Sequence, residues 1–185
     1  MILFPFLVII SFVILIESRG GIFYKQIRVG KDEKDFYLLK FRSMKTDADK
    51  NGLLTIGARD SRITRVGYYL RKYKIDELPQ LINVLIGNMS LVGPRPEVPK
   101  YVEMYTAEQK KVLSVKPGIT DYASIEYSDE NERLAKAENP DQVYINEIMP
   151  SKLQMNLKYI AEQGVVTDLK IIFKTIQKIV VRTKK

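Results

Sequence analysis

The chain has 185 residues and a formal net charge of +8, with neither cysteine nor histidine, so we expect one domain with a sizeable core and an anionic partner. The missing residue types exclude disulfides, a thiolate nucleophile, an imidazole base and a zinc site with its usual ligands. Any catalysis must therefore use Asp, Glu, Lys, Arg, Tyr, Ser or Thr, and any metal must be a hard, oxygen-bound ion such as Mg²⁺.

Residues 1–16 are almost wholly apolar. As one continuous helix they would reach about 24 Å, short of the roughly 30 Å hydrocarbon core of a bilayer, and Pro5 would kink or interrupt that helix. A signal peptide fits poorly, because no basic residues precede the run and no small-x-small cleavage site follows it. A buried helix of a soluble protein is the alternative, but so apolar a run at a terminus favours the membrane.

Basic residues follow this run at Arg19, Lys25 and Arg28, so the positive-inside rule places the rest of the chain in the cytoplasm. We therefore predict that residues 1–19 form a shallow or re-entrant membrane anchor and that residues 20–185 form a domain at the cytoplasmic face. The absence of a basic lead-in also indicates that the anchor lacks its natural first few residues.

Two strand-like segments around a polar loop predict a β-hairpin. Residues 22–29 alternate between apolar and polar, residues 30–35 are polar, and residues 36–44 are again largely apolar. Near the end of the second segment, Lys40 and Arg42 fall on the same face because side chains of a strand alternate with a period of two.

Residues 63–73 have the apolar spacing of a helix, with arginines, lysine and tyrosine on the opposite side. A basic amphipathic helix of this kind can lie in a membrane interface. The alternative is a core helix with a solvated basic face, and the sequence leaves both open.

An acidic pair, Asp76 and Glu77, stands where the next helix is expected to begin. One buried helical stripe is predicted by the spacing of Leu78, Leu81, Ile82 and Leu85. Pro79 suits a first helical turn and Gly87 a helix end, so Asp76 is the expected N-cap. Both acids would then lie at the positive end of the helix dipole, which favours their ionised forms and suits a nucleophile or a metal ligand. An acidic N-cap on an ordinary helix is the alternative.

The rest of the chain gives weaker patterns. The prolines of residues 91–99 predict a stiff, extended loop that holds Arg95 at low entropic cost. Residues 106–109 have the form of a capping box, and residues 116–120 form a Pro-Gly turn before a short extended piece. A long helix is expected from Thr167-Asp168 to Arg182, and its basic face can dock on a core or on anionic lipid headgroups. No Walker-type or Gly-x-Gly-x-x-Gly loop is present.

Together, these features favour phosphoryl transfer. Clustered Arg and Lys neutralise phosphate charge and position the group, and a carboxylate can act as the nucleophile through an acyl-phosphate intermediate. The apolar terminus indicates that one substrate is itself a lipid.

Several motifs occur in an order that resembles the bacterial sugar transferase family of small monotopic phosphoglycosyl transferases. They are Phe23–Gly30, Lys40–Met44, Arg65–Gly67 with Leu70-Arg71, Asp76–Gln80 with Asn83–Leu85, Gly87–Ser90, Gly93–Pro96 and Lys116–Thr120. The similarity covers nearly everything from Pro5 to Thr120, with a weaker similarity at Asp168–Phe173. Each motif alone is weak, but the ordered set is specific.

The resemblance implies an α+β, mainly helical fold. A re-entrant membrane helix, one β-hairpin and amphipathic interfacial helices would surround a small catalytic domain. It also implies an enzyme at the cytoplasmic face of the bacterial inner membrane, which moves a phospho-sugar from a UDP-sugar to undecaprenyl phosphate and releases UMP. Glycosyltransferases of the same pathway are possible partners, and nucleic acid is not expected.

The resemblance also assigns residue roles. It makes Asp76 the nucleophile that forms a covalent phospho-sugar intermediate, and Glu77, with Asp76, the holder of Mg²⁺. The phosphate contacts that it implies are Lys40, Arg42, Arg71 and Arg95.

The sequence departs from the family pattern at several positions. Phe4-Pro5 replaces a frequent Ser-Pro, Asp121-Tyr122 replaces a common Gly-Trp, and Asn156 stands where an acidic residue is frequent. Arg133 is the nearest counterpart of an arginine that is often found slightly earlier. Sugar and uridine contacts in the last third of the chain are therefore not assigned.

Two other functions compete with the enzyme. The first is a catalytically silent, basic module that binds the membrane surface and recruits partners. The second is a nucleic-acid-binding protein, which the charge permits; however, the tyrosines form no evident stacking platform and an apolar terminus would have no use there.

Overall fold

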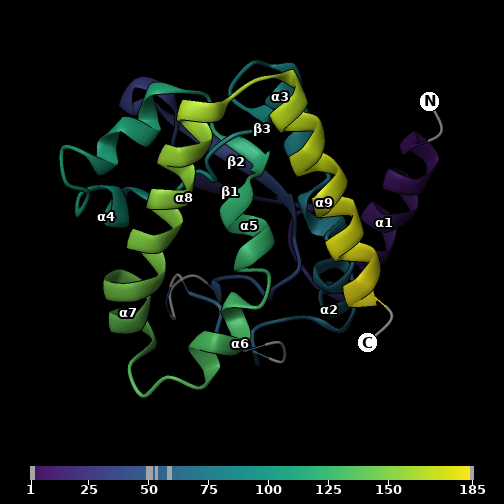
Figure 1. Cartoon of the computed structure of the whole chain (residues 1–185). Coiled ribbons are helices and arrows are strands. Elements are labelled where there is room, and N and C mark those ends of the chain that lie inside the picture. Colours follow the sequence, from purple (N-terminus) through teal and green to yellow (C-terminus); the bar gives the residue numbers. More distant parts are fainter. Residues whose placement is uncertain (1–2, 49–51, 53, 58–59, 184–185) are drawn as a thin grey trace.

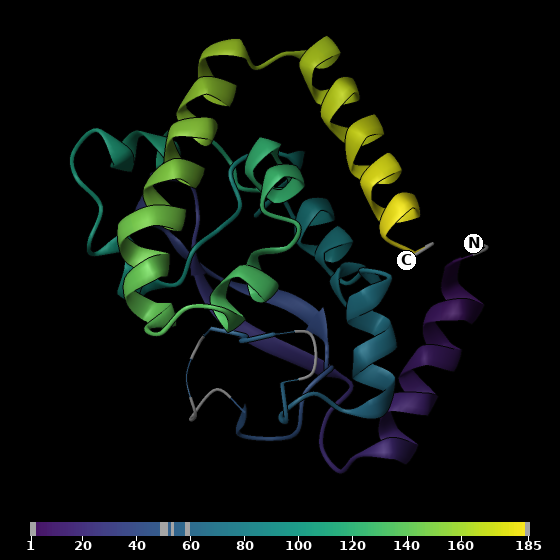
Figure 2. The same ribbon diagram turned by 60° about the horizontal axis from the view of Figure 1, so that its bottom comes forward.

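The computed structural model describes residues 3–48, 52, 54–57 and 60–183. The fold is mixed and mainly helical, with two small two-stranded sheets near its centre (Figure 1). Helices α1, α2 and α9 lie toward one side of the molecule, and α4 and α7 lie toward the other, in both Figure 1 and Figure 2. The prediction of a mainly helical fold that also contains β-strands is confirmed.

Helix α1 (Leu3–Glu17) runs without a break through Pro5. Pro5 lies in its first described turn, where a missing N–H costs no helical hydrogen bond, so the predicted kink is not seen in the described part. One face of α1 buries Ile10 and Ile14 against Phe41 and other apolar side chains of the domain. Within the described ranges, no helix is both long and apolar enough to cross a bilayer.

The predicted hairpin is confirmed. Strand β1 (Phe23–Val29) pairs antiparallel with β2 (Asp35–Phe41), in a register that sets Ile27 opposite Tyr37. A short 3₁₀ turn, η1 (Lys31–Glu33), closes the polar loop between the strands.

Helix α2 (Arg65–Lys72) follows the N-cap Thr64, whose hydroxyl accepts a hydrogen bond from the Gly67 N–H at 2.9 Å. Gly67 packs directly on the chain that leaves β2, and a Cβ on this glycine would lie 1.9 Å from the Ser43 carbonyl oxygen. Leu70 is buried in the cluster that also receives α1. Glu17 at the end of α1 accepts the Val66 N–H at 3.0 Å, which ties α1 to α2.

The prediction for the acidic segment was wrong in two respects. Asp76 is not a helix N-cap but lies inside a 3₁₀ turn, η3 (Ile75–Glu77), whose N-cap Lys74 is left-handed with φ 58°. Helix α3 (Gln80–Leu85) starts only after Pro79, and its end at Gly87, with φ 87°, agrees with the prediction.

The second error concerns which face of α3 is buried. Gln80 and Asn83 are each 1% exposed, whereas Leu85 is 85% exposed. The Asn83 side chain donates to the Tyr37 carbonyl at 2.8 Å and accepts from the Leu39 N–H at 3.0 Å. The unpaired edge of β2 needs these polar partners, so α3 turns its amides inward and leaves Leu81, Ile82, Leu85 and Ile86 exposed.

A second sheet was not predicted. Strand β3 (Ser90–Val92) pairs in parallel with β4 (Gly118–Thr120), which includes part of the predicted Pro-Gly segment. Between them lie α4 (Pro99–Val102) and the 3₁₀ segment η4 (Gln109–Ser114). The predicted capping box is confirmed: the Thr106 N–H donates to the Gln109 side chain at 2.9 Å, and the Gln109 N–H donates back to the Thr106 hydroxyl at 3.2 Å.

The last third of the chain is helical. Its elements are α5 (Tyr122–Glu126), α6 (Glu130–Ala135), α7 (Pro140–Val143), the π-type turn η5 (Tyr144–Ile148), α8 (Met149–Glu162) and α9 (Val165–Thr183). Helix α8 supplies the largest apolar cluster with Met149 and Leu153. The long last helix was predicted, although it begins two residues before Thr167; Ile171 is its fully buried contact and most of its other apolar side chains are exposed.

Candidate active site

Glu77 lies at the centre of a cluster of cationic side chains. Its carboxylate accepts two hydrogen bonds from the Arg95 guanidinium, at 2.6 and 3.3 Å. The ammonium of Lys40 lies 3.6 Å away, and that of Lys74 lies 3.8 Å away. Lys40 lies on β2, Lys74 in the turn before η3 and Arg95 in the loop after β3. The tertiary fold therefore brings these cations together.

These cations decide the charge of Glu77. Burial alone would raise the pKa of its carboxyl, but Arg95, Lys74 and Lys40 together hold that pKa well below its usual range. In return, Glu77 raises the pKa of Arg95. Glu77 is therefore an ionised, charge-balanced carboxylate.

The environment of Asp76 differs from that of Glu77 in its hydrogen bonding and in the direction of its pKa shift. Its side chain is only 4% exposed, and its Oδ1 atom has no hydrogen-bond partner within the described residues. Burial and the adjacent Glu77 charge raise the pKa of Asp76, against the opposing effect of Lys40, Lys74 and Arg71. The expectation that a helix dipole ionises both acids is thus corrected, because the pair lies in a 3₁₀ turn and its neighbours push the two pKa values apart.

Lys40 is also perturbed. Burial lowers the pKa of its ammonium group to about 8, even though Glu77 favours the charged form. Arg71, at the end of α2, acts on Asp76 through its charge. The fold therefore brings Lys40, Arg71 and Arg95 around the acidic pair.

Arg42 is placed elsewhere. Its guanidinium donates hydrogen bonds to the carbonyl oxygens of Ser18, at 2.8 Å, and Arg19. It is 7% exposed and closes the C-terminal end of α1 against the domain. In this arrangement Arg42 holds the end of α1 against the domain, and its role as a phosphate contact stays a prediction.

The loop that carries Arg95 is rigidly held. The Pro94 carbonyl accepts the Gly118 N–H at 3.0 Å, and the Pro96 carbonyl accepts a hydrogen bond from the Arg28 side chain at 2.9 Å. Next to it, Glu97 accepts from Arg28 at 3.1 Å and from the Tyr144 hydroxyl. The prolines predicted a stiff loop, but the polar contacts of Arg28, Glu97 and Tyr144 were not predicted. Their signal in the sequence was Glu97, the acid that directly follows Pro96.

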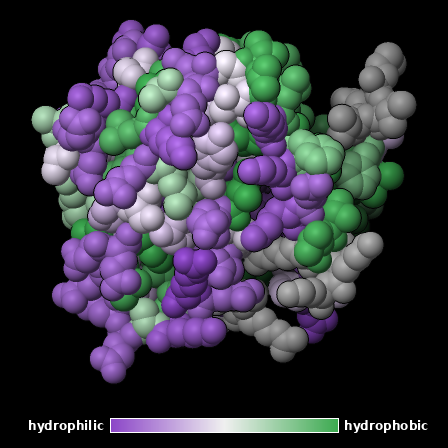
Figure 3. Space-filling model, viewed as in Figure 1, coloured by the Kyte–Doolittle hydropathy of each residue, from purple (hydrophilic) through white to green (hydrophobic). Residues whose placement is uncertain are grey.

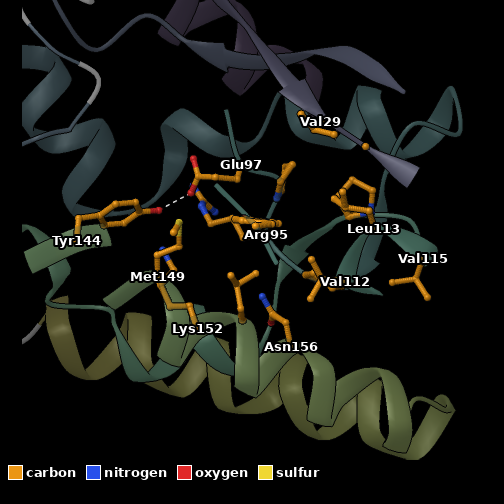
Figure 4. Close-up of a pocket in the computed structure, with 16 residues that line it drawn as sticks. Val29, Arg95, Glu97, Val112, Leu113, Val115, Tyr144, Met149, Lys152 and Asn156 are labelled. Atoms are coloured by element: carbon orange, nitrogen blue, oxygen red, sulfur yellow. Dashed lines mark hydrogen bonds between the residues drawn. The ribbon is translucent and has the colours of Figure 1, made fainter. Parts of the chain in front are cut away.

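A small cavity lies behind this loop, with Arg95, Glu97, Tyr144 and Asn156 on its walls (Figure 4). Its volume of about 30 Å³ has room for a water molecule but not for a sugar nucleotide. Asn156 is buried, and its carbonyl oxygen has no partner among the described residues.

The residues present fit Mg²⁺. This ion commonly uses one or two carboxylates and takes its remaining ligands from water and substrate phosphates. Asp76 Oδ1 is a buried acceptor without a partner in the described part of the chain, and it lies beside the ionised Glu77. Within the described ranges, no group of three or more potential metal-ligating side chains is found, either at this acidic pair or elsewhere.

The site is thus a buried acidic pair among cationic side chains, on a domain with an apolar helix docked at its side. A family model described as "Bacterial sugar transferase" matches residues 1–182. The chain belongs to the bacterial sugar transferase family.

Curated relatives agree with this assignment. The chain is 36% identical, over 94% of its length, to the UDP-glucose:undecaprenyl-phosphate glucose-1-phosphate transferase of Escherichia coli (strain K12). It is 36% identical, over 95% of its length, to the UDP-N-acetylgalactosamine-undecaprenyl-phosphate N-acetylgalactosaminephosphotransferase of Aeromonas hydrophila. It spans only 36% and 39% of these two proteins. By contrast, it spans 86% of the exopolysaccharide production protein PSS of Rhizobium leguminosarum bv. phaseoli, at 35% identity.

Proposed function

We propose that this chain transfers a sugar-1-phosphate group from a UDP-sugar to undecaprenyl phosphate and releases UMP. An Asp76 carboxylate oxygen attacks the sugar-bearing β-phosphorus, and the bond from that phosphorus to the oxygen shared with the α-phosphate breaks. UMP leaves with that oxygen, and the sugar phosphate is held on Asp76 as an acyl phosphate. A phosphate oxygen of undecaprenyl phosphate then attacks the same phosphorus, which frees the carboxylate and forms the undecaprenyl diphosphate sugar.

The observation that carries this proposal is the asymmetry of the acidic pair. Glu77 has its charge balanced by three cations, whereas the buried Oδ1 of Asp76 is unoccupied by any described donor. A buried carboxylate oxygen without hydrogen bonds is poorly solvated and hence more nucleophilic once it is ionised. Lys40, Arg71 and Arg95 supply the positive charge that phosphoryl transfer requires.

Bound Mg²⁺ would neutralise charge that develops on the phosphoryl oxygens. Glu77 and Asp76 are the residues that would hold it. The chain's own cations retain their part: Arg95 and Lys40 orient Glu77 and offset its charge, and Arg71 favours the ionised form of Asp76.

In the direct test, the full chain is placed in membrane vesicles that contain undecaprenyl phosphate. It is then incubated with Mg²⁺ and each of a panel of UDP-sugars. We expect UMP to form with at least one of these UDP-sugars. Repeated turnover should require the lipid acceptor. Intact mass should detect a phospho-sugar adduct on the chain when the acceptor is left out. A silent membrane-surface module would bind the vesicles in a salt-sensitive way but would consume no UDP-sugar.

The pH dependence of the reaction should be set by two of the perturbed groups. Asp76 must be ionised and its pKa is raised, so the rate should fall on acidification at a pH above the usual carboxylate range. Lys40 must be protonated and its pKa is about 8, so the rate should fall by about threefold to tenfold as the pH rises through that value.

The control for the basic limb is Lys40→Arg. This change keeps the positive charge at every accessible pH, so the fall near pH 8 should disappear while the acidic limb stays. An unchanged basic limb in Lys40→Arg would assign that titration to another group.

We also propose that the chain is held at the membrane by its exposed apolar faces. On α1 these include Ile9, Phe12 and Ile16, and on α9 they form the helical stripe Leu169, Phe173, Ile176 and Val180. Hydrophobic side chains gather over α1 and over the start of α9 in Figure 3. Large exposed apolar patches of this kind mark membrane or protein contacts, and the basic residues of α9 favour anionic lipid. Re-entrant insertion of residues 1–19 stays part of this proposal.

The substitution Phe173→Glu tests this attachment. Phe173 is 62% exposed at the middle of the α9 stripe, so we expect binding to anionic phospholipid vesicles to weaken by about tenfold with little change in thermal stability. The matched control is Met104→Glu, which changes an exposed side chain next to α4, on the opposite side of the molecule. Equal losses in both variants, measured by vesicle co-sedimentation, would contradict a specific membrane face.

A further inference from the structure

Asp121 joins two elements of the domain through one carboxylate. It lies between β4 and α5 and is 0% exposed. Its Oδ1 accepts the Ser124 N–H at 2.6 Å and so caps α5, while its Oδ2 accepts the Arg95 N–H at 3.1 Å. Capping alone needs one oxygen, for which Ser, Thr or Asn is sufficient. The second oxygen serves the loop of Arg95.

The Arg95 N–H attaches the loop to Asp121. Pro94 and Pro96 have no N–H, so Arg95 carries the single backbone donor of these three residues. The two proline carbonyls are held by Gly118 and Arg28. The direction in which the Arg95 side chain leaves the loop is therefore fixed at its own N–H by Asp121.

From that point the contacts lead directly to the acidic pair. The Arg95 guanidinium binds both oxygens of Glu77, at 2.6 and 3.3 Å, and Glu77 is the neighbour of Asp76. A fork of two parallel hydrogen bonds tolerates little rotation of either partner. The negative charge of Asp121 also raises the pKa of Arg95, after the larger effect of Glu77.

We propose that Asp121 is a positioning residue for the transfer reaction. By holding the Arg95 N–H, it sets the guanidinium against Glu77 and thereby fixes the cation ring around Asp76. This inference rests on the function proposed above.

The test distinguishes the two contacts of Asp121: the cap on α5 and the hydrogen bond to the Arg95 N–H. Asp121→Ser keeps a hydroxyl that can cap α5 but is too short to serve both partners, and Asp121→Gly removes both contacts. The control, Asn139→Ala, removes the N-cap of α7, where the Asn139 side chain accepts the Gln142 N–H at 3.2 Å. Each full-length variant is compared with the wild type by thermal unfolding, UMP formation from the UDP-sugar panel, and hydrogen exchange.

The hydrogen-exchange measurement follows the exchange rate of one backbone amide, that of Arg95. Overlapping peptides that isolate residues 94–96 report the Arg95 amide alone, because the flanking prolines have none. In Asp121→Ser we expect this amide to exchange at least about tenfold faster and UMP formation to fall by about tenfold or more, with a melting temperature close to that of Asn139→Ala.

Three results would overturn the inference. They are an unchanged exchange rate, faster exchange with full UMP formation, and a loss of UMP formation that only follows the melting temperature across all variants. A wild-type chain that consumes no UDP-sugar would instead refute the proposed function, while the exchange rate would still decide whether Asp121 holds Arg95.

Discussion

Asp76→Asn should reduce UMP formation by at least about a thousandfold, because an amide oxygen cannot displace the nucleotide and form the acyl phosphate. The phospho-sugar adduct should vanish from the intact mass. The fold should persist, since the amide has nearly the same shape as the carboxyl and Asp76 Oδ1 has no hydrogen bond to lose among the described residues.

Stability gives this prediction a second readout. The pKa of Asp76 is raised by burial and by Glu77, so its ionised form opposes folding at any pH above that pKa. At neutral pH the neutral asparagine should therefore leave the free energy of unfolding unchanged or higher. The matched control is Asp129→Asn at an exposed ion pair with Arg133, which should retain UMP formation. Full activity in Asp76→Asn would rule out the nucleophile.

Arg95→Ala should lower the free energy of unfolding by about 3 kcal/mol, because it leaves Glu77 buried with only its weaker lysine contacts. The Arg95 and Glu77 side chains are 27% and 12% exposed and share two hydrogen bonds, whereas Lys40 and Lys74 lie at 3.6 and 3.8 Å. UMP formation should fall as well, since Glu77 would no longer be held in place. Denaturant unfolding and the UMP assay measure the two effects.

Two further variants define the origin of that loss. Arg133→Ala removes an exposed pair with Asp129, in which the side chains are 45% and 47% exposed, and should cost less than about 1 kcal/mol. Arg95→Lys keeps the charge but loses the two-pronged geometry, so we expect it to recover part of the stability and little of the UMP formation. A loss in Arg95→Ala no larger than that in Arg133→Ala would mean that Glu77 does not depend on Arg95.

Local patterns predicted several elements correctly. The hairpin follows from a period of two on both sides of a polar loop, and the capping box at Thr106 and Gln109 follows from two side chains three residues apart. The end of α3 at Gly87 follows from the ease with which glycine adopts positive φ. Each depends on neighbours in the sequence, which is why each could be read from it.

The errors fall where distant segments meet. The spacing of Leu81, Ile82 and Leu85 predicted a buried stripe, but the edge of β2 required the polar face of α3. The parallel pairing of β3 with β4 was missed because short strands far apart in the chain give no periodic signal. The contacts of Arg42 with the carbonyl groups at the end of α1 likewise join distant segments and were not predicted, while its role as a phosphate contact stays a prediction.

By itself, the sequence determined that this chain is a basic, cysteine-free domain with an apolar start, a hairpin, an acidic pair and arginine-bearing loops. Composition and local periodicity are sufficient for that, because they act within a few residues. Only the tertiary structure decided which cations surround Glu77, that Asp76 is buried with a raised pKa, and that Asp121 holds Arg95. Those properties depend on distances and burial created when separate segments pack together, and no local pattern encodes them.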